Sequence, residues 1–189
     1  TSVGTVDRID SVAEIIKNAS KLNKIVVVVS AMGGETNRLV DLAKAFGDDP
    51  DKREFDALVS TGETVSSALL TMALHSKGVK AKSFSASQIS MRTTSSYSKA
   101  KILDVDAKKI LDVVENDTIP IITGFQGVTE GGDVTTLGRG GSDTTAVAIA
   151  AQISAIRCDI YTDVDGIFTT DPGVVPNAKK LDSITMEEM

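Results

Sequence analysis

The residues best suited to chemistry lie at 138–143, where the sequence reads Gly-Arg-Gly-Gly-Ser-Asp and continues directly into an apolar stretch typical of a helix. A glycine-rich turn that opens a helix directs several free backbone N–H groups at one point, and the helix dipole adds partial positive charge there. Arg139 adds a planar guanidinium fork for a pair of anionic oxygens, and Asp143 can hold a cation or a lysine nearby. The stretch therefore predicts a binding site for a phosphate or a carboxylate. The alternative is a tight turn followed by an ordinary N-cap at Ser142.

This loop matches neither of the common phosphate-binding signatures. Gly138 and Gly140 begin like a dinucleotide fingerprint, but Asp143 stands where the third glycine is required. The sequence also contains no G-x-x-x-x-G-K-[ST] run. The prediction of an anion site therefore depends on the residue types of the loop itself.

A second candidate is Glu63, which closes the run Ser60-Thr61-Gly62-Glu63 at the start of a predicted helix. One interpretation is structural: Ser60 or Thr61 caps the helix, and the glutamate complements its dipole. The other is functional, with Glu63 receiving the ammonium group of a substrate. The loop from Ser30 to Thr36 also has two interpretations. It could contact nucleotide and substrate, or it could be a flexible connection.

Two acidic segments near the end of the chain could also bind a ligand. The first is Thr-Asp-Val-Asp-Gly at 162–166, and the second is Thr-Thr-Asp-Pro-Gly at 169–173. A calcium-binding EF-hand is excluded, because Phe168 and Val174 stand where that loop requires glycine and glutamate. Asp163 could bind ribose, base or Mg²⁺, or it could simply form a turn.

The composition narrows the class of protein. The 189 residues carry a net charge of −6 with scattered basic residues, which argues against a nucleic-acid-binding face. The single histidine, His75, excludes His-based metal sites and Ser-His-Asp triads, and we assign no metal ligand. The single cysteine, Cys158, cannot form an internal disulfide, and the apolar runs are far shorter than the about 20 residues that span a bilayer. Without a signal-peptide pattern either, we expect a cytoplasmic protein with no nucleic-acid or membrane partner.

Helical and strand patterns alternate along the chain, which predicts an α/β fold with crossover connections. The β-branched runs at 25–29 and 119–123 are typical of strands buried on both faces of a parallel sheet. Ligands of such sheets bind beyond the carboxyl ends of the strands, where we expect the loops at 30–37, 123–127 and 162–171. Helices are expected at 7–20, 37–46, 51–59, 63–76, 106–116 and 142–155, strands at 25–29, 79–85, 119–123 and 157–162, and a hairpin at 126–137.

Several segments, taken together and in order, are more specific than any single loop. They are TSVG at 1–4, VSAMGGETNRL at 29–39, VSTGE at 59–63, GFQG at 124–127, TTLGRGGSDTTA at 135–146, YTDVDGIFTTDP at 161–172 and KKLDSITMEEM at 179–189. Together they resemble the catalytic domain of the aspartate kinases, within the amino acid kinase family. The resemblance covers essentially the whole chain. It implies one catalytic domain over residues 1–189 and a three-layer αβα sandwich with a mostly parallel central sheet.

The resemblance implies an enzyme that transfers the γ-phosphoryl group of ATP to the β-carboxylate of L-aspartate, giving ADP and 4-phospho-L-aspartate. This reaction is the first step toward lysine, threonine and methionine and, in bacteria, diaminopimelate. The implied cofactors are ATP and Mg²⁺, the partners are the small molecules L-aspartate and ATP, and the full-length protein is expected to be a homo-oligomer. The chemistry agrees, because a carboxylate nucleophile with a reference pKa of ~3.9 is ionised at neutral pH and needs no general base. Two alternatives stay open: another kinase of the same fold, acting on glutamate, N-acetylglutamate, carbamate or UMP, or a nucleotide-binding fragment without turnover.

The site residues that the resemblance implies fall into three groups. Thr36 and Glu63 match aspartate-binding residues. The loop that holds the substrate carboxylate and faces the transferred phosphoryl group is matched by Arg139, Gly140, Gly141 and Ser142, and Asp143 matches the acid that organises the catalytic lysines. Arg139, Ser142 and Asp143 are therefore the expected catalytic residues. The matched nucleotide contacts are Ser30, Thr162, Asp163, Phe168, Thr169, Thr170, Asp171, Pro172 and Gly173.

The chain also departs from the family pattern. The family motif begins Lys-Phe-Gly-Gly before Thr-Ser-Val, so the resemblance places the first strand and a phosphate-contacting lysine before Thr1. Gly173 stands where the family usually has arginine, which is expected to weaken a phosphate contact. The resemblance places a later catalytic lysine and regulatory ACT domains beyond Met189. We therefore expect a domain truncated at both ends, with little or no kinase activity from this chain alone.

Overall fold

The computed structural model describes residues 2–162, 169, 175 and 177–180. The chain divides into two compact units, Thr1–Asp159 and Ile160–Met189. All the helices and strands given below belong to the first unit.

A three-stranded parallel sheet forms the centre of the first unit. Its order is β1-β5-β2, with β5 hydrogen-bonded to a parallel neighbour on each side. All five residues of β5 are buried, as the β-branched run predicts for a central strand. The strands are β1 (Val27–Val29), β2 (Ala81–Phe84) and β5 (Ile119–Thr123).

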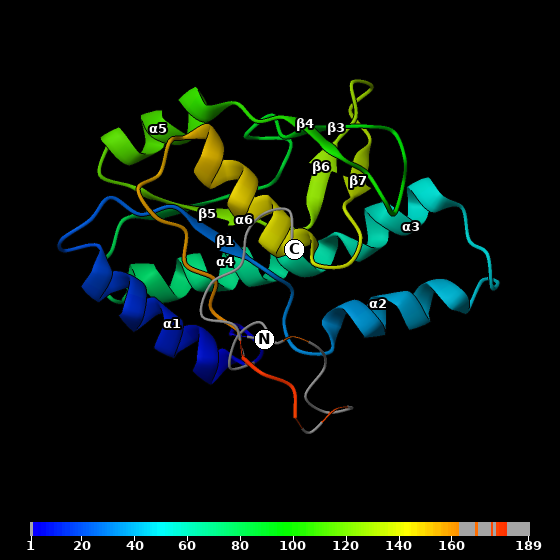
Figure 1. Cartoon of the computed structure of the whole chain (residues 1–189), viewed down its shortest axis with the longest axis horizontal. Helices are drawn as coiled ribbons and strands as arrows, with labels where there is room; N and C mark the ends of the chain where they lie inside the picture. Colours follow the sequence, from blue (N-terminus) through cyan, green and yellow to red (C-terminus); the bar gives the residue numbers. More distant parts are fainter. Residues whose placement is uncertain (1, 163–168, 170–174, 176, 181–189) are drawn as a thin grey trace. The chain divides into compact units, whose positions relative to one another are not determined.

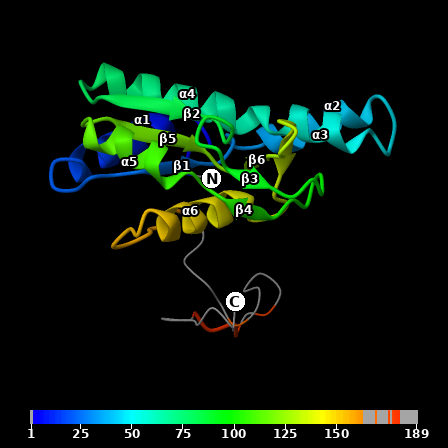
Figure 2. The ribbon, with the colours of Figure 1, turned by 90° about the horizontal axis from the view of Figure 1, so that it is seen from above.

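Helices cover both faces of this sheet. Successive side chains of β5 point to opposite faces, so Ile121 packs in one buried cluster and Ile122 in another. On the first face Ile121 joins Leu70 of α4, and on the second Ile122 joins Ile149 of α6. Burial of such a side chain stabilises the fold by about 1.5–3 kcal/mol. Figure 2 shows α4 and α6 on opposite sides of the strands. The predicted three-layer αβα sandwich is confirmed, with α1 (Val6–Ala19) and α4 (Thr61–Ser76) on one face and α5 (Ala107–Glu115) and α6 (Gly141–Gln152) on the other.

A second sheet consists of four short strands, in the order β4-β3-β6-β7. The predicted hairpin is its β6–β7 pair, in which Gln126 lies opposite Thr136, and it projects beyond the neighbouring strands in Figure 1. Gly132 takes a φ of +89° in the hairpin turn, a conformation that favours glycine. Strands β3 and β4 were not predicted. The four strands are β3 (Arg92–Thr93), β4 (Ile102–Asp104), β6 (Gln126–Val128) and β7 (Val134–Thr136).

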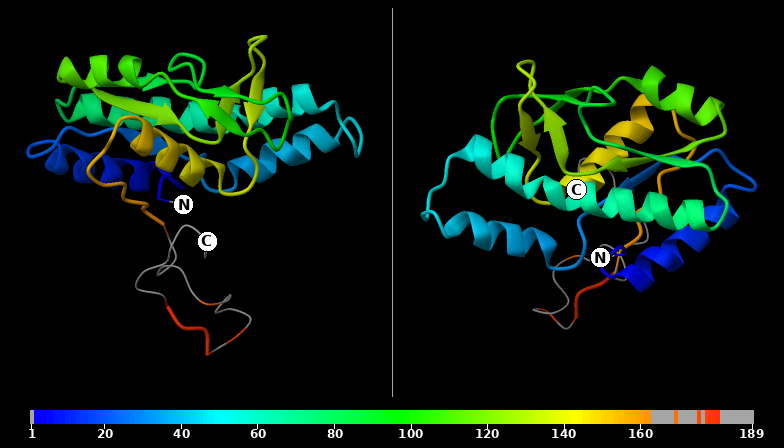
Figure 3. Two further views of the ribbon diagram at one scale, coloured as in Figure 1. Left: turned by 45° about the horizontal axis from the view of Figure 1, so that its top comes forward. Right: turned by 180° about the vertical axis from the view of Figure 1, so that it is seen from behind.

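Helices α2 (Glu35–Lys44) and α3 (Lys52–Val59) connect β1 to α4. Figure 3 shows α3 and α4 following one another almost in line. Residues 52–76 are the one stretch in the described part of the chain that is long and apolar enough to cross a membrane. Half of its most apolar part is buried inside the protein, and the stretch carries the buried carboxyl groups of Asp56 and Glu63. Those features are typical of a core helix pair.

The strand predicted at 157–162 is wrong. These residues are exposed, and they pair with none of the described strands. A strand is held by hydrogen bonds to a neighbouring strand, and this segment has no such neighbour among the described residues. The preceding helix also ends earlier than expected, at Gln152.

Candidate functional site

The candidate site is built at the carboxyl ends of β1 and β5. The backbone N–H of Gly124, just after β5, donates to the carbonyl of Val29 at the end of β1 (2.8 Å). Gly124 also touches the first turn of α6, because a Cβ at this position would lie 2.7 Å from the Cβ of Ser142. Only glycine permits so close an approach. The two strand ends and the start of α6 therefore meet at one place, as the sequence predicts for a ligand site.

The predicted glycine-rich turn opens α6. Gly140 is the N-cap, in the left-handed conformation with φ +69°, and no side chain caps the helix. The alternative of an ordinary cap at Ser142 is therefore wrong. The backbone N–H groups of Ser142 and Asp143 donate to no acceptor in the part of the chain that the structure describes. An uncapped helix start of this kind offers free donors and partial positive charge to an anion.

The two charged residues of this turn are both accessible. Arg139 and Asp143 are exposed, and neither forms an ion pair with another described residue. Gly141 is buried against Phe125. A Cβ at this position would lie only 2.7 Å from the Phe125 ring. The turn thus rests on Phe125 and presents its guanidinium to solvent or to a ligand.

Glu63 is the buried acid of the site. Its side chain belongs to the first turn of α4 and is 3% exposed. Oε1 accepts the backbone N–H of Ala31 (3.1 Å), but the buried Oε2 has no hydrogen-bond partner. Burial raises the pKa of Glu63 to about 7, although the Ala31 N–H bond acts in the opposite direction. A cationic group placed beside Oε2 would satisfy this oxygen and favour the ionised form.

The purely structural interpretation of this run is not confirmed, since neither hydroxyl caps α4. The Ser60 hydroxyl donates to the carbonyl of Ala57 (3.1 Å), and that of Thr61 donates to Leu58 (2.7 Å). Ser60 is the N-cap by position, but it makes no side-chain cap bond. Glu63 remains the unexplained group of the run.

The loop at 30–37 is fastened to α4 at the same place. The Ser66 hydroxyl donates to the carbonyl of Ser30 (2.6 Å), next to the Ala31–Glu63 contact. Gly62 packs so closely on this loop that a Cβ would lie 2.9 Å from the Cβ of Ala31. Thr36 is half-buried in the first turn of α2. Ser30 and Glu63 are thus brought together, and Thr36 follows in the next helix.

Most of the predicted nucleotide contacts belong to the second unit, Ile160–Met189. Asp163, Phe168, Thr170, Asp171, Pro172 and Gly173 lie outside the described residues. Thr162 and Thr169 are described. The N–H of Thr169 donates to the carbonyl of Lys179 (2.9 Å), and its hydroxyl accepts from the N–H of Lys179 (3.1 Å). Within the described residues no three acidic, His or Cys side chains gather as a metal site would require.

Two buried polar residues connect elements near the site and were not predicted from the sequence. Gln126 accepts the Thr123 hydroxyl (2.8 Å) and donates to the carbonyl of Ser60, so it joins the end of β5 to the start of α4. Asp56 on α3 holds Thr136 of β7. Gln126 belongs to the GFQG segment, but no local pattern distinguishes a partner 66 residues away.

Comparisons with known proteins agree with this geometry. The model of the amino acid kinase family matches residues 1–189. An aspartate kinase of Pseudomonas putida is 55% identical over 100% of this chain and 46% of its own length. Aspartokinase 2 of Bacillus subtilis is 52% identical over 100% of this chain and 47% of its own length. The chain thus spans about half the length of these relatives. The Escherichia coli aspartokinase III structure with aspartate and ADP superposes with a TM-score of 0.85 at 30% identity, covering 96% of this chain and 52% of its own.

Proposed function

Because the chain belongs to the amino acid kinase family, we propose that it forms the catalytic site of an aspartate kinase. The reaction transfers the γ-phosphoryl group of ATP to the β-carboxylate of L-aspartate. The observation that carries the proposal is the buried Glu63, whose Oε2 has no hydrogen-bond partner. Glu63 lies at the carboxyl ends of the strands, where the start of α6 also presents its free N–H groups. One group suits an ammonium and the other suits anionic oxygens, and L-aspartate and ATP carry both.

The substrate roles follow from these charges. Glu63 pairs with the α-ammonium of aspartate, and Thr36 in the first turn of α2 adds a hydroxyl contact. Arg139 grips a substrate carboxylate through its two-pronged guanidinium. Gly140 and Gly141 let the backbone come close to the transferred phosphoryl group, and Ser142 offers its free N–H there.

The chemical step needs positioning more than proton transfer. An oxygen of the ionised β-carboxylate attacks the γ-phosphorus, the bond from that phosphorus to the β–γ bridging oxygen breaks, and ADP leaves with the electron pair. Negative charge on the γ-phosphoryl oxygens is stabilised by the N–H groups at Ser142 and by Arg139. Asp143 organises nearby cationic groups.

The nucleotide contacts in this proposal are those that the family resemblance implies. Ser30, Thr162, Asp163 and the segment 168–173 contact ATP. Mg²⁺ would be supplied with the triphosphate, since it is usually bound through substrate phosphates, water and one or two carboxylates. When bound, it would neutralise phosphate charge.

The product, 4-phospho-L-aspartate, makes this the first step toward lysine, threonine, methionine and diaminopimelate. We infer a cytoplasmic enzyme whose complete form is a homo-oligomer. We also infer little turnover from the 189-residue chain by itself.

An acyl-phosphate trap tests the proposal. The complete protein is incubated with ATP, Mg²⁺ and hydroxylamine, which converts an acyl phosphate to a hydroxamate that can be measured by its colour with iron. L-Aspartate, L-glutamate and N-acetyl-L-glutamate are supplied in separate reactions. Hydroxamate from L-aspartate alone supports the proposal. A signal from L-glutamate retains phosphoryl transfer but refutes L-aspartate as the substrate. A signal from N-acetyl-L-glutamate, which has no ammonium, also refutes the assignment of Glu63 as the ammonium partner.

A further inference from the structure

Asp56 is a fully buried carboxylate for which the proposed reaction has no direct use. It lies on α3 with 0% of its surface exposed. Its Oδ2 accepts the backbone N–H groups of Ser98 and Thr136, each at 2.8 Å. Its Oδ1 accepts the hydroxyls of the same two residues, at 2.9 and 3.0 Å. Four hydrogen bonds from neutral donors therefore compensate for the burial of this group.

Ser98 and Thr136, the two residues that Asp56 binds, lie next to the start of the glycine-rich turn. Thr136 is the last residue of β7 and precedes Arg139 by three positions. Its carbonyl accepts the N–H of Ala100 (2.9 Å). The carbonyl of Ser98 lies only 3.4 Å from where a Cβ of Gly138 would stand. Asp56 therefore connects the segment at 98–100 to the residues that lead into the turn.

Ser98 also adopts a conformation that needs support. Its φ is +64°, in the left-handed region that residues other than glycine rarely occupy. Such a conformation is strained and persists where surrounding contacts fix it. The bonds from its N–H and hydroxyl to Asp56 are those contacts.

Helix α3, which carries Asp56, leads directly into α4, which carries Glu63. Helix α3 ends at Val59 and α4 begins at Thr61, and the Gln126 side chain donates to the carbonyl of Ser60 between them. One nearly straight helical segment therefore carries Asp56 at one position and Glu63 seven residues later (Figure 3).

We propose that Asp56 is a positioning residue that fixes the turn at 138–141 relative to Glu63, so that Arg139 and Glu63 grip the two ends of one substrate. This inference rests on the proposed function. A misplacement of about 1 Å in such a pair can lower the rate by about 100-fold.

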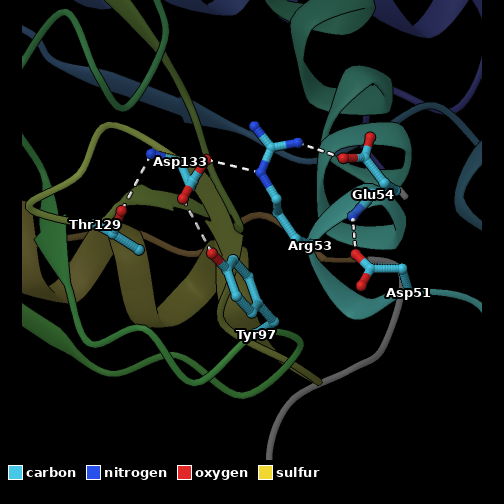
Figure 4. A network of polar contacts seen from close by, with 6 residues as sticks. All are labelled: Asp51, Arg53, Glu54, Tyr97, Thr129 and Asp133. Carbon is cyan, nitrogen blue, oxygen red and sulfur yellow. Dashed lines mark hydrogen bonds and ion pairs between the residues drawn. The ribbon is translucent and has the colours of Figure 1, made fainter.

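A second connection between α3 and the hairpin provides a matched control. Arg53 pairs with Asp133 at the hairpin turn (2.8 Å), and Asp133 also accepts the Tyr97 hydroxyl (3.1 Å), as Figure 4 shows. The Arg53 side chain is 51% exposed, and Asp133 lies at the end of the hairpin opposite to Thr136. This exposed pair joins the same elements but does not touch the base of the turn.

The test compares D56A, D56N and R53Q in the complete protein, measuring KM and kcat separately for L-aspartate and for ATP. D56A should raise the KM for L-aspartate by about tenfold or more, because the Arg139 turn loses its anchor, and should change the KM for ATP by less than about twofold. D56N should stay within about threefold of wild type, since its amide can accept both N–H groups while donating to the two rotatable hydroxyls. R53Q should match wild type.

A merely structural role would lower the amount of active protein without changing the KM for L-aspartate. That result in D56A would overturn the inference, as would an equal KM change in R53Q. If D56A does not fold, S98A/T136V removes only the two hydroxyl bonds, and an unchanged KM for L-aspartate in this variant would overturn the inference too. Absence of aspartate turnover in wild type would instead remove the proposed function, and this inference with it.

Discussion

Replacing Glu63 by glutamine should change how the stability of the protein depends on pH. In the folded protein burial raises the pKa of Glu63 from 4.5 to about 7. Between these values the folded state holds a proton that the unfolded state has released, so the free energy of unfolding falls as pH rises through this window. The gap of about 2.5 pKa units corresponds to about 3 kcal/mol, which is lost by the time the pH is well above 7.

Glutamine keeps an oxygen that can accept the Ala31 N–H but cannot ionise. E63Q should therefore resemble protonated wild type near pH 5 and exceed wild type in stability by about 3 kcal/mol at pH 8. Urea unfolding followed by circular dichroism at pH 5, 6, 7 and 8 gives this difference directly. E130Q is the control for the substitution itself, because Glu130 is an exposed glutamate. A stability difference between E63Q and wild type that does not change with pH would refute the interpretation that Glu63 is buried without a partner for its charge.

The remaining predictions concern the site and its frame. An ammonium binds ionised Glu63, whose pKa is raised to about 7. The affinity for L-aspartate, measured by calorimetry, should therefore rise with pH up to about 7 and then level off. An affinity independent of pH would contradict this prediction. Gly124→Ala places a methyl 2.7 Å from Ser142 and 2.9 Å from its Cα, and should cost about 1–3 kcal/mol of unfolding free energy in urea. Gly140→Ala should cost about 1 kcal/mol, because φ is +69° although no atom lies within 4 Å of the new methyl; an equal or greater stability than wild type would show that this conformation is not retained. Arg139→Lys should lower kcat/KM by at least about tenfold, since lysine lacks the planar fork, while leaving the melting temperature unchanged.

Much of the fold could be predicted because the pattern of apolar side chains along the sequence indicates which residues are buried. The β-branched run that becomes β5 is buried throughout, and alternate residues face two helical layers. The segment at 157–162 shows the limit of this signal. A strand also needs a neighbour that supplies hydrogen bonds, and the local sequence does not say whether one is present.

Part of the local geometry of the candidate site could be predicted for a similar reason. Glycines at 140 and 141 next to an arginine indicate an open helix start, and the structure has one. Asp56 gives no such local signal. Its partners lie 42 and 80 residues away along the chain, and only the folded arrangement of α3 and β7 brings them to it.

The most direct test of the account is whether Glu63 recognises the substrate ammonium. The measurement is kcat/KM for L-aspartate and for succinate, which lacks only the amino group, in wild type and in E63Q of the complete protein. We predict that wild type prefers L-aspartate by about 100-fold or more, as expected for a charged hydrogen-bonded pair of about 3 kcal/mol, and that E63Q loses most of this preference. An equal preference in both proteins would contradict the assignment of Glu63 and with it the proposed arrangement of the site.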